Sequence, residues 1–211
     1  MSVEVEKLCK RHPDLIACKK DIESAIDTVK ECYKNNNKVL TCGNGGSAAD
    51  AEHIVGELMK GSRKKRKVSS VFSEKIKGFY PQECKQLCDN LQIPLPAISL
   101  TSHLSFTTAF NNDMNPEFTF TQQLFGLGKE GDVLIALSTS GNAKNVINAC
   151  KLAKVLGIKT IALTGKDGGT LKDICDIVIR VPEEETFLVQ EYHLPIYHAI
   201  CSAIENEFFE K

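Results

Sequence analysis

Five short apolar runs, separated by stretches of helical periodicity, constrain the fold of this chain most strongly. The runs cover residues 38–42, 97–100, 133–137, 160–163 and 177–181. Helical spacing of apolar residues extends over residues 14–35, 48–59, 143–156 and 186–209. Short buried strands that alternate with helices indicate a parallel sheet with helices on both faces. We therefore predict an α/β fold, a three-layer αβα sandwich around a five-stranded parallel sheet.

Composition narrows the class of protein further. The 211 residues suit one domain over residues 1–211, and 42% of them are hydrophobic, which excludes general disorder. Lys and Arg number 26 against 27 Asp and Glu, so the net charge of −1 argues against a protein that binds nucleic acid over its whole surface. No apolar run approaches the roughly 20 residues of a membrane span, and the start of the chain is too polar for a signal peptide. We expect no membrane partner.

The nine cysteines are scattered and lack the paired spacing of a zinc site or a disulfide framework. Reduced thiols that pack in a core are typical of proteins from a reducing compartment. We therefore predict a cytoplasmic protein whose cysteines carry no chemistry.

Residues 61–94 follow neither a helical nor a strand pattern clearly and form an insertion-like segment. It begins with a run of five basic residues at 63–67, and Cys84 and Cys88 follow at helical spacing. Such a run either contacts nucleic acid or a phosphorylated ligand, or is the solvated face of a loop. Such runs are more often solvated, so we favour the loop face, and the lack of an aromatic stacking platform argues further against nucleic acid.

Three turns at the predicted ends of strands have unusual chemistry. Residues 43–47 read Gly-Asn-Gly-Gly-Ser, with Ser47 as the expected N-cap of the next helix. Residues 138–142 read Ser-Thr-Ser-Gly-Asn, and residues 164–169 are also rich in glycine. Glycines allow close backbone approach, and a helix N-terminus favours an anion. Since neither the Walker pattern nor the dinucleotide fingerprint occurs at these turns, they favour a phosphorylated ligand other than a nucleotide.

Ionisable side chains fall on two predicted helices. His53 and Glu57 are four residues apart, and Gln190 and His198 are eight apart, so each pair shares one helix face. The four side chains either converge on one cation or substrate, or are ordinary structural residues. We assign His12 and His103, together with the acidic run at 183–185, to the structural class.

The four ordered strings at residues 42–47, 138–142, 163–169 and 190–193 resemble the sugar isomerase (SIS) domain family, and more narrowly its phosphoheptose isomerase branch. The resemblance implies a single SIS domain and an aldose–ketose isomerase that converts sedoheptulose 7-phosphate to D-glycero-D-manno-heptose 7-phosphate through an enediol(ate). It also implies a homotetramer with active sites at subunit interfaces. Non-catalytic SIS modules that bind a sugar phosphate, and isomerases of other phosphosugars, stay open as alternatives.

The resemblance also assigns roles to residues. Glu57 would be the catalytic carboxylate and His198 the catalytic imidazole. A zinc ion would be held by His53, Glu57, Gln190 and His198. Substrate contacts would come from Asn44, Gly45, Gly46, Ser47, Glu57, Asn112, Asp113, Ser138, Thr139, Ser140 and Gln190.

Two departures separate this chain from the family pattern. Ala143 stands where the family usually has a serine, so one hydroxyl for the phosphate is missing. Residues 61–94 are about twenty residues longer than the family usually shows. We expect both departures to bear on which phosphosugar binds.

Overall fold

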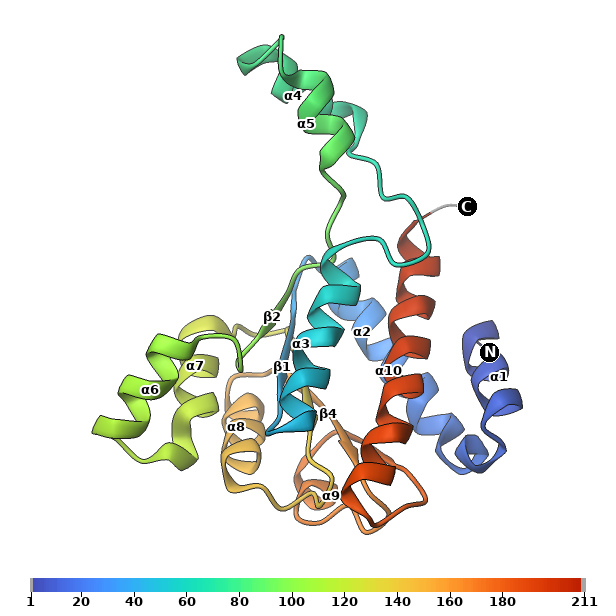
Figure 1. Cartoon of the computed structure of the whole chain (residues 1–211), viewed down its shortest axis with the longest axis vertical. Helices are drawn as coiled ribbons and strands as arrows, with labels where there is room; N and C mark the ends of the chain where they lie inside the picture. Colours follow the sequence, from blue (N-terminus) through green and yellow to red (C-terminus); the bar gives the residue numbers. More distant parts are fainter. Residues whose placement is uncertain (1, 210–211) are drawn as a thin grey trace.

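The computed structural model describes residues 2–209 and contains the predicted sheet (Figure 1). The ends of the predicted domain, residues 1, 210 and 211, lie outside the described residues. Five parallel strands pair in the order β2-β1-β3-β4-β5. They are β1 (Val39–Cys42), β2 (Ala97–Ser99), β3 (Val133–Leu137), β4 (Lys159–Thr164) and β5 (Ile177–Arg180). The five predicted runs are confirmed, with bounds that shift by a residue or two.

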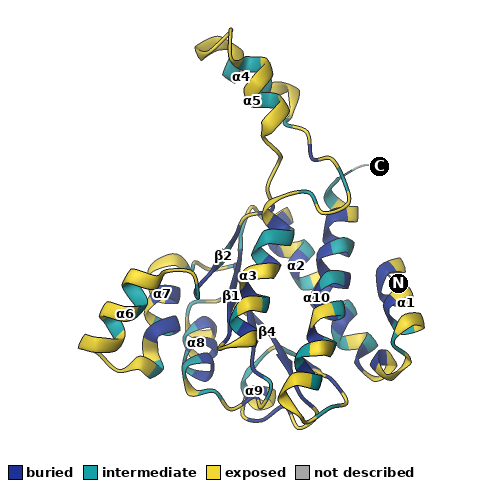
Figure 2. Ribbon diagram, viewed as in Figure 1, coloured by how far each residue is buried: buried dark blue, intermediate teal, exposed yellow. Residues whose placement is uncertain are grey.

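Strand β3 shows why helices cover both faces, because all five of its residues are buried. Val133, Ile135 and Leu137 join one core cluster, whereas Leu134 and Ala136 join another. The first cluster packs against α1 (Val3–Arg11), η1 (Pro13–Cys18), α2 (Lys19–Lys34), α3 (Gly46–Met59) and α10 (Thr186–Phe208). The second packs against α7 (Thr119–Leu127), α8 (Lys144–Val155) and α9 (Leu171–Ile174). The predicted three-layer sandwich is therefore confirmed, with the dark core between the layers in Figure 2.

The N-terminal region differs from the single helix predicted over residues 14–35. Pro13 starts a short 3₁₀ helix, and α2 begins only at Lys19. Helix α1 was not predicted; its first turn carries Glu4 and Glu6, and its last turn carries Lys10 and Arg11. These charges suit the helix dipole, but the apolar face of α1 is too short to give a clear periodic pattern.

The strand order brings two predicted ligand turns together. The chain passes from β1 to β2 at the sheet edge and then returns to β3 on the other side of β1. Residues 43–47 and 138–142 follow β1 and β3, which are paired neighbours. The carboxyl ends of strands at such a reversal form a crevice where α/β proteins bind ligands. The two turns therefore flank one site.

The segment at 61–94 forms a helical hairpin that stands away from the sheet (Figure 1). It consists of α4 (Ser70–Phe79) and α5 (Cys84–Asn90), neither of which contains a buried residue. The bridge between Lys67 and Gln92 closes its base. The predicted helical relation of Cys84 and Cys88 is confirmed, with their sulfur atoms 4.0 Å apart. The remaining elements are α6 (Leu104–Asp113) and η2 (Pro116–Phe118).

Across residues 2–209, every helix is too short or too polar to cross a membrane.

Candidate functional site

A cavity of about 330 Å³ lies at the carboxyl ends of β1 and β3. The turns after the two strands form most of its wall, and Gln190 and Thr186 from α10 close one side. The predicted substrate residues that line it are Asn44, Gly45, Gly46, Ser47, Ser138, Thr139, Ser140 and Gln190. The structure therefore brings eight of the eleven predicted substrate residues to one place.

The first turn depends on two glycines. Gly45 has a φ of 57°, and a Cβ on Gly46 would lie 2.7 Å from the side-chain amide of Gln190. Gly45, rather than Ser47, is the N-cap of α3, so the predicted cap is wrong. Ser47 is buried inside the first turn of the helix, because the backbone bend that starts α3 occurs at the positive-φ glycine two residues earlier.

Asn44 is held in the cavity wall by a residue that the sequence analysis missed. Its amide and that of Asn145 donate to each other, at 2.9 Å in both directions. The side-chain oxygen of Asn145 also accepts a hydrogen bond from the backbone of Val146. Asn145 thereby joins the first turn of α8 to the first ligand turn, although nothing in the sequence indicates this pairing.

The turn at residues 138–142 packs against the turn at residues 164–169. The Gly165 amide donates to the Thr139 carbonyl, and the Leu171 amide donates to the Gly141 carbonyl. A Cβ on Gly141 would lie 2.1 Å from the carbonyl oxygen of Gly168. The glycines of residues 164–169 therefore allow close packing under the Ser138–Ser140 turn, and residues 164–169 do not line the cavity.

Two helix N-termini adjoin the cavity. Gly46 begins α3, and Ala143 precedes the first residue of α8. Unpaired amides and the helix dipole at such ends favour an anion. Hydroxyls from Ser138, Thr139 and Ser140 add neutral hydrogen-bond donors. The cavity is thus suited to a phosphate group.

A second group of side chains lies further along α3 and α10. His53, Glu57 and His198 each offer a ligand atom, and these atoms all lie within 4.8 Å of one another. His53 Nε2 is 3.7 Å from Glu57 Oε1, and the rings of His53 and His198 are 5.0 Å apart. Burial and the neighbouring His53 lower the pKa of His198, which keeps its imidazole neutral and able to bind a cation.

Tyr197 and Asp50 extend this group. The Tyr197 hydroxyl donates to Asp50 Oδ1 at 3.1 Å and lies 2.9 Å from His53 Nδ1. Burial and the charge of Asp50 raise the pKa of the tyrosine, so its proton stays in place. Burial also raises the pKa of Asp50, against the hydrogen bond from Tyr197. Neither residue was predicted to belong to the site.

The fourth predicted zinc ligand, Gln190, does not join the group of His53, Glu57 and His198, and the predicted substrate residues Asn112 and Asp113 lie elsewhere. Gln190 lies with its amide against Gly46, and it is eight residues, or about 12 Å along the α10 axis, from His198. Asn112 and Asp113 lie exposed at the end of α6 and bond to each other at 2.8 Å. They do not line the cavity of their own chain.

Comparisons with known proteins identify the family. The SIS domain family model matches residues 97–204, and a second SIS domain model matches residues 10–72. The phosphoheptose isomerase of Aliarcobacter butzleri is 42% identical over 186 residues, which cover 88% of this chain and 85% of that protein. The chain belongs to the SIS domain family, in its phosphoheptose isomerase branch.

Solved structures of SIS proteins agree with this assignment. The phosphoheptose isomerase of Neisseria gonorrhoeae is 32% identical, with a TM-score of 0.70 over 94% of this chain and 98% of that one. The phosphoheptose isomerase of Francisella tularensis is 30% identical, with a TM-score of 0.72 over 95% and 97% of the two chains. The SIS fold therefore extends over nearly the whole chain.

The basic run at 63–67 is only in part the solvated loop that we predicted. Arg66 is 1% exposed and pairs with the buried Glu205 of α10 at 3.0 Å. Arg63 pairs with Glu4, and Lys64 donates to the carbonyl of Phe209. The expectation of a solvated face is therefore wrong for Arg66, because buried carbonyl and carboxylate oxygens satisfy its guanidinium.

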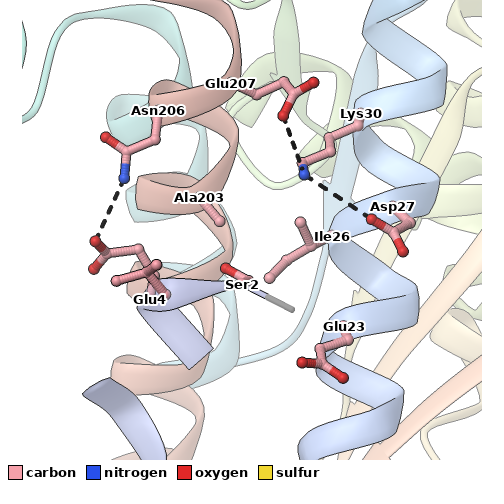
Figure 3. Close-up of a pocket in the computed structure, with 10 residues that line it drawn as sticks. Ser2, Glu4, Glu23, Ile26, Asp27, Lys30, Ala203, Asn206 and Glu207 are labelled. Atoms are coloured by element: carbon pink, nitrogen blue, oxygen red, sulfur yellow. Dashed lines mark hydrogen bonds and ion pairs between the residues drawn. The ribbon is translucent and has the colours of Figure 1, made fainter. Parts of the chain in front are cut away.

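Another cavity, of about 350 Å³, lies between α1, α2 and α10 (Figure 3). None of its lining residues belongs to the turns at residues 43–47 and 138–142. Its charged lining consists of four carboxylates and the single lysine Lys30, which pairs with Glu207 at 3.2 Å. Its acidic residues are Glu4, Glu23, Asp27 and Glu207. An excess of negative charge repels a phosphorylated sugar, so this cavity is not the substrate site.

Proposed function

We propose that this chain interconverts sedoheptulose 7-phosphate and D-glycero-D-manno-heptose 7-phosphate. The observation that carries the proposal is the group of His53, Glu57 and His198, which extends from the same two helices that border the anion cavity. The relatives named phosphoheptose isomerases, at 42% identity, support this reaction. A module that only binds a sugar phosphate needs neither the carboxylate nor the imidazole.

The substrate phosphate binds in the proposal at the two helix N-termini and the hydroxyls of residues 138–140. Ala143 offers no hydroxyl, so the phosphate has one donor fewer than in a serine-bearing relative. Hydrogen bonds to a charged group stabilise binding by about 1.5–3 kcal/mol each. Anchoring the distal phosphate orients the reacting carbons at the other end of the sugar.

Isomerisation moves one proton between two neighbouring carbons. The Glu57 carboxylate removes the proton from the carbon next to the carbonyl and returns it to the former carbonyl carbon, by way of an enediol(ate). His198 transfers a proton between the two oxygens. The ring nitrogen of its neutral imidazole that does not hold the cation donates its proton to one oxygen and takes a proton back from the other. Atoms and charge balance, and no redox partner is required.

Zn²⁺ is the proposed cofactor, one per subunit. The donor set fits zinc, which binds imidazole nitrogen and carboxylate oxygen and keeps an open position in catalytic sites. His53, Glu57 and His198 would hold the ion, and Gln190 joins them in the proposal only if its side chain leaves Gly46. When bound, zinc polarises the substrate oxygens and stabilises the developing negative charge.

The proposed enzyme is a homotetramer with shared active sites. Glu57 is eleven residues from Gly46, about 16 Å along the α3 axis. The phosphate end and the reacting end of the sugar therefore need different sets of residues to bind them. Asn112 and Asp113 are exposed on α6, a helix without buried residues in its own chain. In the proposal they complete the cavity of a neighbouring copy. Light scattering of the purified protein measures the predicted mass of four chains.

We propose that residues 1–211 act as one domain, with residues 61–94 as an insertion, and that the protein works in the cytoplasm. The nine cysteines, all within the described residues, form no disulfide. Free thiols, five of them buried, fit a reducing compartment. Limited proteolysis tests the domain proposal, which predicts cleavage at the exposed hairpin and a body that otherwise resists digestion.

The experiment that tests the proposed reaction is a panel of five- to seven-carbon ketose phosphates, each assayed with and without added zinc. We expect turnover of sedoheptulose 7-phosphate that rises with zinc and falls with a chelator. Stabilisation by sugar phosphates without any turnover would instead support a binding module. Turnover confined to a shorter sugar would assign the chain to another phosphosugar.

A further inference from the structure

The hydroxyl of Tyr197 lies between two polar groups of α3 in an almost fully buried position. Tyr197 is 1% exposed, and its hydroxyl is 3.1 Å from Asp50 Oδ1 and 2.9 Å from His53 Nδ1. Asp50 and His53 are three residues apart and therefore share one face of the helix. Tyr197 packs edge-on against both His53 and its sequence neighbour His198.

These contacts fix which atom carries each proton. An ionised carboxylate only accepts hydrogen bonds, so the single proton of the Tyr197 hydroxyl goes to Asp50. The hydroxyl oxygen then faces His53 Nδ1 with a lone pair. At 2.9 Å that contact is a hydrogen bond only if Nδ1 carries a proton. In neutral His53 the other nitrogen, Nε2, is consequently left with a free lone pair.

Nε2 of His53 lies near a second electron-rich atom. Nε2 is 3.7 Å from Glu57 Oε1, and a ligand atom of His198 completes the group within 4.8 Å. A lone pair and a carboxylate repel each other unless a cation lies between them. The hydrogen bonds from His53 to Tyr197 and from Tyr197 to Asp50 therefore keep the proton on Nδ1 and leave Nε2 free to bind a metal ion.

We infer that Tyr197 is a positioning residue, which together with Asp50 holds His53 in the Nδ1-protonated form with Nε2 directed at the cation site. The inference deepens the proposed function and rests on it for the identity of the cation. An outer partner of this kind fixes the orientation and the tautomer of a ligating histidine, and its loss typically weakens metal affinity 10- to 100-fold.

The first test reads the tautomer without any metal. The zinc-free protein is labelled with ¹⁵N-histidine, and two-bond ¹H–¹⁵N correlations are recorded at pH 7.5, with His53→Gln to assign the signal. We expect the proton of His53 on Nδ1, and we expect Tyr197→Phe to lose this preference. A wild-type His53 that carries its proton on Nε2 would overturn the inference, whatever the native metal is.

The second test measures zinc affinity by competition with a chromophoric chelator. Tyr197→Phe should bind zinc 10- to 100-fold more weakly than the wild type. Tyr33→Phe is the matched control, because Tyr33 is also buried and its hydroxyl donates to the Pro96 carbonyl instead of to a group near His53. We expect that variant to bind zinc within twofold of the wild type.

The outcomes separate the two proposals. Equal zinc affinity in Tyr197→Phe and the wild type would contradict the positioning role while leaving the zinc site intact. A wild type that binds no zinc, but whose His53 is protonated on Nδ1, would contradict the proposed cofactor. It would still support the role of Tyr197 and Asp50 in holding His53. Thermal unfolding of both zinc-free variants checks that each remains folded.

Discussion

The guanidinium of Arg66 lies 3.0 Å from the carboxylate of Glu205, and their side chains are only 0% and 2% exposed. Arg66 also donates to the carbonyls of Glu57 and Leu58 at the end of α3. The end of a helix leaves carbonyl groups without partners inside the helix, and Arg66 satisfies two of them. The pair thereby connects the base of the protruding hairpin to both helices that carry the proposed catalytic residues.

Arg66→Met should destabilise the protein by about 3–5 kcal/mol, because a buried carboxylate then loses its counter-charge. Urea unfolding monitored by circular dichroism measures the free energy of unfolding. Lys65→Met is the control, since Lys65 is an exposed neighbour in the same run, and it should change stability by less than about 0.5 kcal/mol. The double variant Arg66→Met/Glu205→Leu should recover part of the loss. Equal stability of Arg66→Met and the wild type would contradict a structural role for the pair.

His193 should make the protein less stable in mild acid. It is fully buried on α10, neither ring nitrogen forms a hydrogen bond within the described residues, and burial lowers its pKa from about 6.5 to about 4. Because the unfolded chain binds the proton more tightly, the free energy of unfolding falls as the pH drops from about 6.5 to about 4. The full contribution is about 3 kcal/mol.

Replacing His193 with leucine should remove this contribution. As the pH falls from 7 to 4.5, the unfolding free energy of the wild type should therefore drop more than that of His193→Leu. Urea titrations at several pH values measure it, with His103→Gln, at an exposed position, as the control for replacing a histidine. A difference that does not vary with pH would show that His193 is not held neutral by burial.

Gly141→Ala should disturb the phosphate turn. Gly141 has a φ of 66°, and a Cβ there would meet the backbone carbonyl of Gly168 at 2.1 Å. The added Cβ meets backbone atoms of Gly168 and Gly169, which cannot rotate away as a side chain could. The turn at residues 138–140 must therefore shift. We expect KM for the sugar phosphate to rise about 10- to 100-fold. Gly126→Ala, in a helix with open space around it, should leave KM unchanged. Unchanged kinetics in Gly141→Ala would place the phosphate elsewhere.

Local patterns were sufficient to predict the sheet and the turns. Val133–Leu137 is a continuous apolar run followed by hydroxyl residues, and this pattern predicts a buried parallel strand with a ligand turn. The helical spacing of His53 and Glu57 also indicated correctly that they share a face. These features depend on residues close together in the sequence, so one chain is enough to detect them.

Contacts between distant residues were beyond the sequence analysis. Arg66 looks like one of five solvated basic residues until Glu205, 139 positions later, is seen beside it. The bonds between Asn44 and Asn145, and between Tyr197 and Asp50, likewise join separate elements. Helical periodicity marks Tyr197 as a core residue, but it does not reveal what its hydroxyl contacts.

Turnover by Glu57→Gln decides whether this carboxylate is the base of the isomerisation. Glutamine has nearly the same shape as glutamate but cannot remove a proton from carbon. Glu57→Gln should lose about 10²- to 10⁴-fold in kcat while still binding sedoheptulose 7-phosphate, as measured by calorimetry, with zinc content determined in parallel. Glu52→Gln, on the exposed side of the same helix, should retain wild-type turnover. A Glu57→Gln enzyme that isomerises the sugar at the wild-type rate would show that Glu57 is not the base.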